Sequence, residues 1–321
     1  MPSVQPVVSE QQILQILGRH FSGAVSDVAI VTGGEVARTV GFSAEGQAFI
    51  LRLVTKQMGA TYEKEARIWR KLAPRVPIPR VLHAGRFGDW NYAISERVPG
   101  KPLVQHTWEE NELLMPQLIE VIHAIHGTDI SDTHGYGLFD DQEVGMCASW
   151  QEHLLRIEEE EPEWEFFGKW HALFETTFLE RDVFTFVYQG MVKLLDYCPQ
   201  ERYLVHGGPA FGNVIAHEGQ ITGEIDWLDA RYGDFVYDVA WSDIWAPRLR
   251  MAERFQQFCE ARGIVLPHYE QRLLCYRCYM CLDGMRYYAK VGKVEGYRWV
   301  KKAILDWLGT KLGIIVLHQL L

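Results

Sequence analysis

The sequence predicts an α+β fold of two lobes. A small antiparallel β lobe with one main helix is expected over residues 1–97, and a large, mostly helical lobe over residues 98–321. Apolar residues alternate between glycine turns in the first part, whereas in most of the second they recur at helical spacing. A strand-rich segment at residues 202–227 interrupts these helices. At 321 residues the chain can bury two hydrophobic cores.

The first lobe is expected to run strand, strand, strand, helix, strand, strand after a short amphipathic helix. The pairs Gly33-Gly34 and Glu45-Gly46 supply the turns between the first three strands, and prolines separate the main helix from the last two. In chain order, the predicted elements are a helix at 10–22, strands at 28–31, 36–42 and 48–54, a helix at 62–72, and strands from 81 and across Gly88-Asp89.

The segment Ser-Glu-Arg-Val-Pro-Gly at 95–100 is the natural connector to the second lobe. Beyond it, apolar periodicity predicts helices at about 112–126, 149–160, 182–197, 251–262, 268–290 and 294–312. Cys275, Cys278 and Cys281 fall three residues apart within one of these helices, so we expect three buried thiols on one helix face rather than a metal site or disulfides.

The composition limits the classes of partner. The formal net charge is −10, which argues against nucleic acid and anionic membranes as partners and is compatible with a cationic ligand. The first residues lack the basic and apolar segments of a signal peptide, and the apolar stretch at 313–317 is too short to span a bilayer. We therefore expect a cytoplasmic location.

The segment at 204–216 carries the strongest chemical signal. It reads Leu-Val-His-Gly-Gly-Pro-Ala-Phe-Gly-Asn-Val-Ile-Ala, and Gly-Glu-Ile-Asp-Trp follows at 223–227. Protein kinases use an Asp to accept the substrate hydroxyl proton, an Asn five positions later for a metal ion, and a later Asp for the nucleotide-bound Mg²⁺. Asn213 and Asp226 match the last two in order and spacing, whereas Gly208 occupies the position of the base.

With these motifs placed, the sequence resembles the aminoglycoside phosphotransferase family, and within it the hygromycin B phosphotransferases. The resemblance covers most of the chain and implies a protein-kinase-like bilobal fold. It also implies transfer of phosphate from ATP or GTP, with Mg²⁺, to a hydroxyl group of a cationic aminocyclitol, which gives antibiotic resistance. The blocks that carry it are 48–53, 77–82, 92–97, 135–139, 204–206, 213–214, 225–227, 230–234 and 237–240.

The family pattern in the loop is His-x-Asp-x-x-x-x-Asn. By this resemblance, His206 braces the loop, and Asn213 and Asp226 bind Mg²⁺, whose preferred ligands are oxygens of this kind. The departure at Gly208 predicts transfer reduced by about 10² or more. A pseudokinase-like binder of a small ligand stays open, as does a kinase of another hydroxyl substrate such as a macrolide, choline, homoserine or a sugar.

The resemblance also points to the nucleotide-binding residues. Arg52 would hold the phosphates, with Glu65 as its partner; the alternatives are an Arg52 that points to solvent and Glu63 in place of Glu65. The turn with Gly33 and Gly34 would cover the phosphates through backbone N–H groups. The backbone of the connector, namely Ser95, Glu96, Arg97 and Val98, would contact adenine.

Carboxylates and aromatic rings are the side chains expected to bind the substrate. The acids between 132 and 165 far outnumber the bases, although for the run at 158–163 a solvated helix face or loop is the better explanation. Asp234 and Asp238 are expected to brace the loop after Ile-Asp-Trp. The substrate candidates are Asp229, Asp283, Tyr232 and Trp241, with the alternatives that Asp283 pairs with Arg286 and that the aromatic residues belong to the core.

Overall fold

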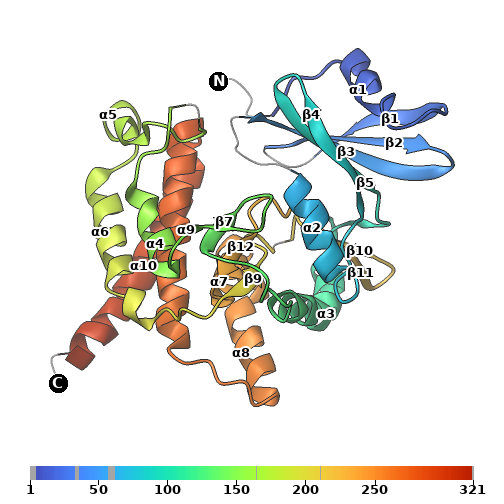
Figure 1. Ribbon diagram of the computed structural model, residues 1–321. Helices are drawn as coiled ribbons and strands as arrows, with labels where there is room; N and C mark the ends of the chain where they lie inside the picture. Colours follow the sequence, from blue (N-terminus) through green and yellow to red (C-terminus); the bar gives the residue numbers. More distant parts are fainter. Residues whose placement is uncertain (1–4, 33–35, 57–61, 164, 210, 320–321) are drawn as a thin grey trace. The chain divides into compact units, whose positions relative to one another are not determined.

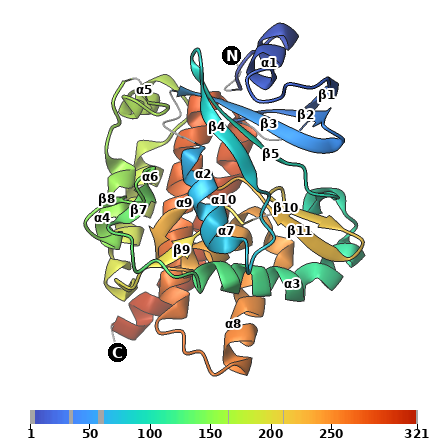
Figure 2. The same cartoon turned by 45° about the vertical axis from the view of Figure 1, so that its right-hand side comes forward.

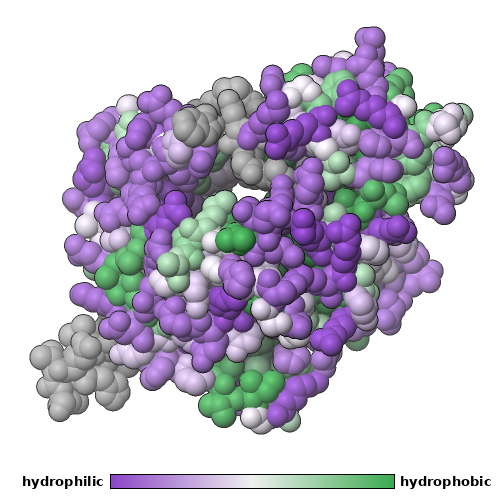
Figure 3. All heavy atoms as spheres, in the orientation of Figure 1, coloured by the Kyte–Doolittle hydropathy of each residue, from purple (hydrophilic) through white to green (hydrophobic). Residues whose placement is uncertain are grey.

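The computed structural model describes residues 5–32, 36–56, 62–163, 165–209 and 211–319 (Figure 1). The chain forms two compact units. The first consists of Met1–Asp132, Asp140–Glu143 and Gly208–Ala230, and the second of Thr133–Phe139, Val144–Gly207 and Arg231–Leu321. Hydrophilic side chains predominate on the face shown in Figure 3, and the apolar areas between them are small.

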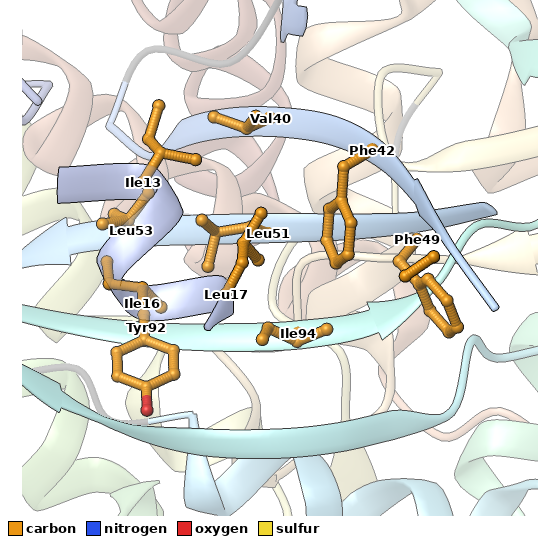
Figure 4. Packing of buried hydrophobic residues seen from close by; sticks show 11 residues of the cluster. Ile13, Ile16, Leu17, Val40, Phe42, Phe49, Leu51, Leu53, Tyr92 and Ile94 are labelled. Carbon is orange, nitrogen blue, oxygen red and sulfur yellow. The ribbon is translucent and has the colours of Figure 1, made fainter. Parts of the chain in front are cut away.

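The first unit is built on a five-stranded antiparallel sheet in the order β1-β2-β3-β5-β4. Alternating apolar residues of the inner strands face helix α1, which begins at a capping box formed by Ser9 and Gln12. Leu17, Leu51 and Ile94 meet in this core and are fully buried (Figure 4). The elements are α1 (Glu10–Leu17), β1 (Val25–Val31), β2 (Arg38–Ala44), β3 (Gln47–Thr55), β4 (Val81–Phe87) and β5 (Trp90–Glu96).

Helix α2 (Glu63–Leu72) packs beside β4, as Figure 2 shows. Its inward face is apolar toward the C-terminal end, where Ile68 and Leu72 are buried. Toward the N-terminal end the buried residues are charged, Lys64 and Glu65. Because buried charges require partners, this end of the helix is expected to serve a site rather than the core.

A second, three-stranded sheet completes the first unit in the order β11-β10-β6. Strand β6 (Lys101–Pro102) pairs with β10 (Val214–His217), and β11 (Gln220–Glu224) forms a hairpin with β10. Helix α3 (Trp108–His126) lies against this hairpin (Figure 2), where the Gln117 side chain donates to the Gly219 carbonyl at 2.9 Å.

These contacts explain why the compact units do not divide at the expected boundary between residues 97 and 98. The segment after the connector pairs with a hairpin more than a hundred residues later, through Val104 N–H to Phe211 O at 3.1 Å as well as through β6. Residues 98–132 and 208–230 therefore fold with the first unit. Local sequence patterns contain no signal for so distant a pairing.

The second unit is mainly helical. Its short four-stranded sheet has the order β8-β7-β12-β9, with β7 (Tyr136–Phe139), β8 (Gly145–Cys147), β9 (Tyr203–Val205) and β12 (Arg231–Gly233). Helix α9 lies in contact with α6, α7 and α10 and buries Cys275, Cys278 and Cys281 completely, as predicted. The helices are α4 (Trp150–Leu155), α5 (Leu173–Thr176), α6 (Arg181–Val192), α7 (Val236–Trp245), α8 (Met251–Ala261), α9 (Tyr269–Val291) and α10 (Val294–Gln319).

Helix α7 was not among the predicted elements. Val236, Val239 and Ile244 are buried, but so are Asp238 and Ser242, so the helix has no clear polar face. An amphipathic pattern is the main sequence signal for a helix of this length, and a helix buried on most sides lacks it. Among the described residues, none of the helices combines the length and the apolar character needed to cross a membrane.

Asp234 holds helices α7 and α9 together through a buried ion pair. Its carboxylate is fully buried, accepts from Arg272 Nε at 2.8 Å and from Val236 N–H at 3.1 Å, and also binds the Tyr276 hydroxyl and Arg272 Nη2. The expectation that Asp234 and Asp238 brace the loop after Ile-Asp-Trp therefore does not hold for Asp234.

Asp234→Ala should lower the free energy of unfolding by about 3–5 kcal/mol, because it leaves the buried Arg272 guanidinium without its counter-ion. Urea denaturation followed by circular dichroism measures the change. The control is Asp306→Ala, which removes an exposed ion pair with Lys302 and should change the free energy by less than about 1 kcal/mol. Equal effects of the two substitutions would contradict the role given to Asp234.

Candidate functional site

A tight hairpin places Asn213 and Asp226 next to each other. Asn213 immediately precedes β10 and Asp226 closely follows β11, and the two strands are joined through Glu218 and Gly219, which have φ of 48° and 76°. Past the last strand pair, Ile225 N–H donates to the Asn213 carbonyl at 2.8 Å. The thirteen-residue spacing seen in the sequence thus becomes a side-by-side arrangement.

The Asn213 side chain has a defined orientation. Its Nδ2 donates to the Gly208 carbonyl at 2.9 Å, and only the NH₂ end of an amide can make this bond. The Oδ1 atom is therefore the end of the amide that can bind a cation. The same bond joins Asn213 to Gly208, five positions earlier, within the first unit.

Asp226 adopts a left-handed backbone conformation with φ of 68°, which is uncommon for a residue other than glycine. Asp226 as a whole residue is exposed, but the protein atoms around its carboxyl group desolvate the charge and raise its pKa to about 6. Arg52 opposes this rise, whereas the carboxylates of Asp229 and Glu65 add to it. A carboxylate crowded by other acids and an amide oxygen together fit a hard cation such as Mg²⁺.

Arg52, on β3, is bound by Glu65 of α2. Its Nη1 donates to Glu65 Oε1 at 3.0 Å, and Nη2 also pairs with this carboxylate. The guanidinium lies over the Tyr62 ring at 4.9 Å. Glu63 is exposed, so the predicted pairing of Arg52 with Glu65 is present and both alternatives are wrong. Glu65 Oε1 also accepts from Trp227 N–H at 3.2 Å, which links Arg52 to the residue after Asp226.

The start of the catalytic loop is held within the second unit. The buried Asp238 carboxylate accepts from His206 N–H at 2.9 Å and from Gly207 N–H at 2.8 Å. Gly207 has φ of 88°, a conformation that favours glycine, and His206 is fully buried. Asp238 therefore braces the loop that begins at His206, not the one after Ile-Asp-Trp.

Some backbone groups of the residues predicted to contact adenine already form hydrogen bonds within the first unit. Ser95 is buried in β5, Glu96 N–H donates to the Arg80 carbonyl at 3.0 Å, and Arg97 N–H donates to the Ala48 carbonyl at 3.1 Å. These two N–H groups cannot also bind a base, so an adenine at this connector would use other groups, among them those of Val98. Gly33 and Gly34, predicted to cover the phosphates, lie outside the described residues.

The structure separates the four substrate candidates. Asp229 is exposed in the first unit and lies near enough to Asp226 to affect its pKa. Tyr232 is 1% exposed and stacks on Phe139 at 4.2 Å, so it is a core residue and the prediction of a substrate contact is wrong. Its strand β12 lies inside the sheet, between β7 and β9, which the sequence did not indicate.

The other two candidates belong to the second unit. Trp241 is half-buried, with its ring 5.9 Å from that of Trp245. Asp283 pairs with Arg286 at 2.8 Å, which was the alternative considered for it, yet its side chain remains 49% exposed. Arg286 is buried over the Phe167 ring at 4.0 Å, so the Asp283 carboxylate is fixed in place but still open to solvent.

Sequence reasoning missed Lys64. Its side chain is buried, and Nζ donates to the carbonyl oxygens of Leu228 and Ala230, at 3.0 and 2.6 Å. The only signal in the sequence was its position next to Glu65 at the start of the helix. It was overlooked because a long basic side chain on a helix is usually solvated.

Comparison with known proteins shows which family this chain resembles. Residues 27–273 match the profile of the phosphotransferase enzyme family (APH). The chain is 29% identical to hygromycin-B 4-O-kinase of Escherichia coli over 302 residues, which cover 92% of this chain and 84% of that protein. It is 24% identical to aminoglycoside 3'-phosphotransferase of Enterococcus faecalis over 67% of this chain and 77% of that one.

Solved structures show the same relation. The crystal structure of aminoglycoside phosphotransferase APH(4)-Ia superposes with a TM-score of 0.77 at 27% identity, covering 93% of this chain and 99% of that chain. Spectinomycin phosphotransferase APH(9)-Ia, at 14% identity and a TM-score of 0.61, shares the fold. The predicted kinase-like α+β fold and the predicted phosphotransferase class are thereby confirmed. The chain belongs to the phosphotransferase enzyme family.

Proposed function

We propose that this chain binds ATP or GTP with Mg²⁺ and transfers phosphate slowly to a hydroxyl group of a cationic aminocyclitol of the hygromycin B type. The observation that carries the proposal is the hairpin that brings Asn213 and Asp226 together, with Gly208 in place of the base. We place the protein in the cytoplasm, where both nucleotides are abundant. Transfer of this kind gives antibiotic resistance, and we propose that it is impaired in this chain because Gly208 replaces the base.

Ternary complexes of the relative support the substrate class. APH(4)-Ia has been crystallised with AMP-PNP and hygromycin B, and with ADP and hygromycin B. Three of these complexes carry an alanine substitution, one at an aspartate and two at asparagines that lie four and five positions further along that chain. The longer interval equals that from Gly208 to Asn213. The variant of that relative with the aspartate replaced still forms a ternary complex with ADP and hygromycin B.

In this proposal, each site residue of the first unit has a defined role. Bound Mg²⁺ would neutralise charge on the transferred phosphate, and Asn213 Oδ1 with the Asp226 carboxylate would hold it. The Arg52 fork, oriented by Glu65, would donate to phosphate oxygens. No carboxylate at 208 takes the hydroxyl proton. Positioning and charge stabilisation remain, so transfer is expected at about 10⁻²–10⁻⁴ of the rate with a base.

Single-turnover transfer tests the proposal. Excess protein is incubated with Mg²⁺ and γ-labelled ATP in the presence of hygromycin B, and label in the aminocyclitol is followed for hours. Slow, magnesium-dependent labelling is expected. Nucleotide binding without any transfer would favour the pseudokinase-like alternative, and labelling of a macrolide, choline, homoserine or a sugar instead would contradict the substrate class.

Arg52→Lys should weaken Mg-nucleotide binding by about 10-fold or more. Lysine keeps the charge but loses the forked donor, and one charge-assisted hydrogen bond contributes about 1.5–3 kcal/mol. Isothermal titration calorimetry measures the change, with Arg38→Lys on the neighbouring strand β2 as the control. Unchanged affinity in Arg52→Lys would show that Arg52 does not bind phosphate.

A further inference from the structure

The chain after Asp226 forms a tight turn that helix α2 holds at both ends. Ala230 N–H donates to the Trp227 carbonyl at 3.1 Å, which closes the turn. At its start, Trp227 N–H donates to Glu65 Oε1 at 3.2 Å. The Trp227 indole fixes the start further, because Nε1 donates to the Glu224 carbonyl at 3.0 Å and the ring is 2% exposed.

Lys64 holds the other end of this turn. Its Nζ donates to Leu228 O at 3.0 Å and to Ala230 O at 2.6 Å, so the ammonium binds the carbonyls on either side of Asp229. Two consecutive residues of one helix therefore hold the turn. The Lys64 ammonium donates to two of its carbonyl oxygens, and the Glu65 carboxylate accepts from its first N–H.

Lys64 is only 5% exposed. An ammonium group is costly to bury unless hydrogen bonds replace its water, and carbonyl oxygens supply them here. Basic residues further along the same helix behave differently: Lys71 has a side chain 20% exposed and binds the carboxylates of Asp132 and Glu143. Lys64 is therefore buried because of its bonds to the turn, and not because of a property shared by the basic residues of the helix.

The conformation of Asp226 requires such support. A non-glycine residue with φ of 68° is disfavoured and persists only where the surrounding structure fixes it. Before Asp226 the chain is fixed by the bond from Ile225 N–H to Asn213 O, and after it by the two residues of α2. Without the second support, the backbone at Asp226 would be fixed on one side only.

We propose that Lys64 is a positioning residue for the metal-nucleotide site. It acts through the backbone of residues 228 and 230, which set the left-handed conformation that directs the Asp226 carboxylate toward the cation. The inference rests on the proposed function, because it presupposes that Asp226 binds Mg²⁺. It adds a second residue of α2 to the Arg52–Glu65 pair as a determinant of that site.

The test compares AMP-PNP binding with and without Mg²⁺ by isothermal titration calorimetry in the native chain, Lys64→Met and Lys71→Met. Loss of a residue that orients a metal ligand typically weakens metal binding by about 10–100-fold. Lys64→Met should lower the magnesium-dependent gain in affinity by that factor and leave metal-free affinity within about threefold. Lys71→Met, which removes a cation from the same helix, should behave like the native chain.

Two results would overturn this inference but not the proposed function. The first is a magnesium-dependent gain in affinity in Lys64→Met that equals that of the native chain. The second is an equal loss of affinity with and without Mg²⁺, as general damage to the fold would cause. If Lys64→Met does not fold, Lys64→Gln is used, because it retains an N–H donor but not the charge. A native chain without any magnesium-dependent gain would overturn the proposed function and this inference with it.

Discussion

Gly208→Asp should raise the rate of phosphate transfer to hygromycin B by about 10²–10⁴-fold, the usual contribution of a general base. Every other loop feature is already in place. The Gly208 carbonyl accepts the Asn213 side chain, and Asp238 holds the amides of His206 and Gly207. An aspartate at 208 would add the proton acceptor that the proposed site lacks.

Two matched controls separate a base from a mere change in loop charge or shape. Gly208→Asn has the size of aspartate but cannot accept the proton and should not raise the rate. Gly212→Asp places a carboxylate in the same loop, at a position where a Cβ would meet nothing within 4 Å, and should also give no gain. If Gly208→Asp behaves like these controls, position 208 is not that of the base.

Asp226→Asn should weaken magnesium-dependent nucleotide binding by about 100-fold or more. Removing a residue that only orients a metal ligand already reduces affinity by about 10–100-fold, and here the charged ligand itself is replaced. Asparagine has nearly the same size as aspartate and, like aspartate, tolerates a left-handed backbone, so the conformation at 226 is retained. A fluorescent ATP analogue displaced by Mg-ATP gives the affinity.

Asp132→Asn is the control for Asp226→Asn. It neutralises an exposed acid of the same unit, Asp132, which pairs with Lys71. Asp132 is far in the sequence from all the proposed site residues. Its nucleotide affinity should equal that of the native chain. If Asp226→Asn matches it, Asp226 is not a metal ligand and the hairpin has another purpose.

The sequence predicted the elements whose patterns are local. Strand β3 and helix α2 lie within two residues of their expected positions because alternation and helical spacing are strong there. Helix α7 could not be recognised, since burial on most sides removes the amphipathic pattern. The division at residue 97 differed from the compact units because the pairing of β6 with β10 joins residues more than a hundred positions apart.

The site was predictable where spacing encodes geometry. Asn213 and Asp226 are brought together by the hairpin between them, and Glu65 faces inward where Glu63 does not. The burial of Tyr232 was not predictable, because it depends on which strands flank β12.

Backbone bonds explain two further differences from the sequence prediction. The N–H groups of Glu96 and Arg97 bind the carbonyls of Arg80 and Ala48, and Lys64 is buried where the turn at 227–230 lies next to α2. In each case the deciding partner lies far away in the sequence.

The central claim is that Asn213 and Asp226 together hold a magnesium nucleotide. Isothermal titration calorimetry with AMP-PNP tests it most directly, on the native chain and on Asn213→Ala/Asp226→Ala. We expect binding in the native chain that strengthens with Mg²⁺, and no effect of Mg²⁺ in the double variant. Absence of nucleotide binding in the native chain, or a magnesium effect that persists in the double variant, would contradict the claim.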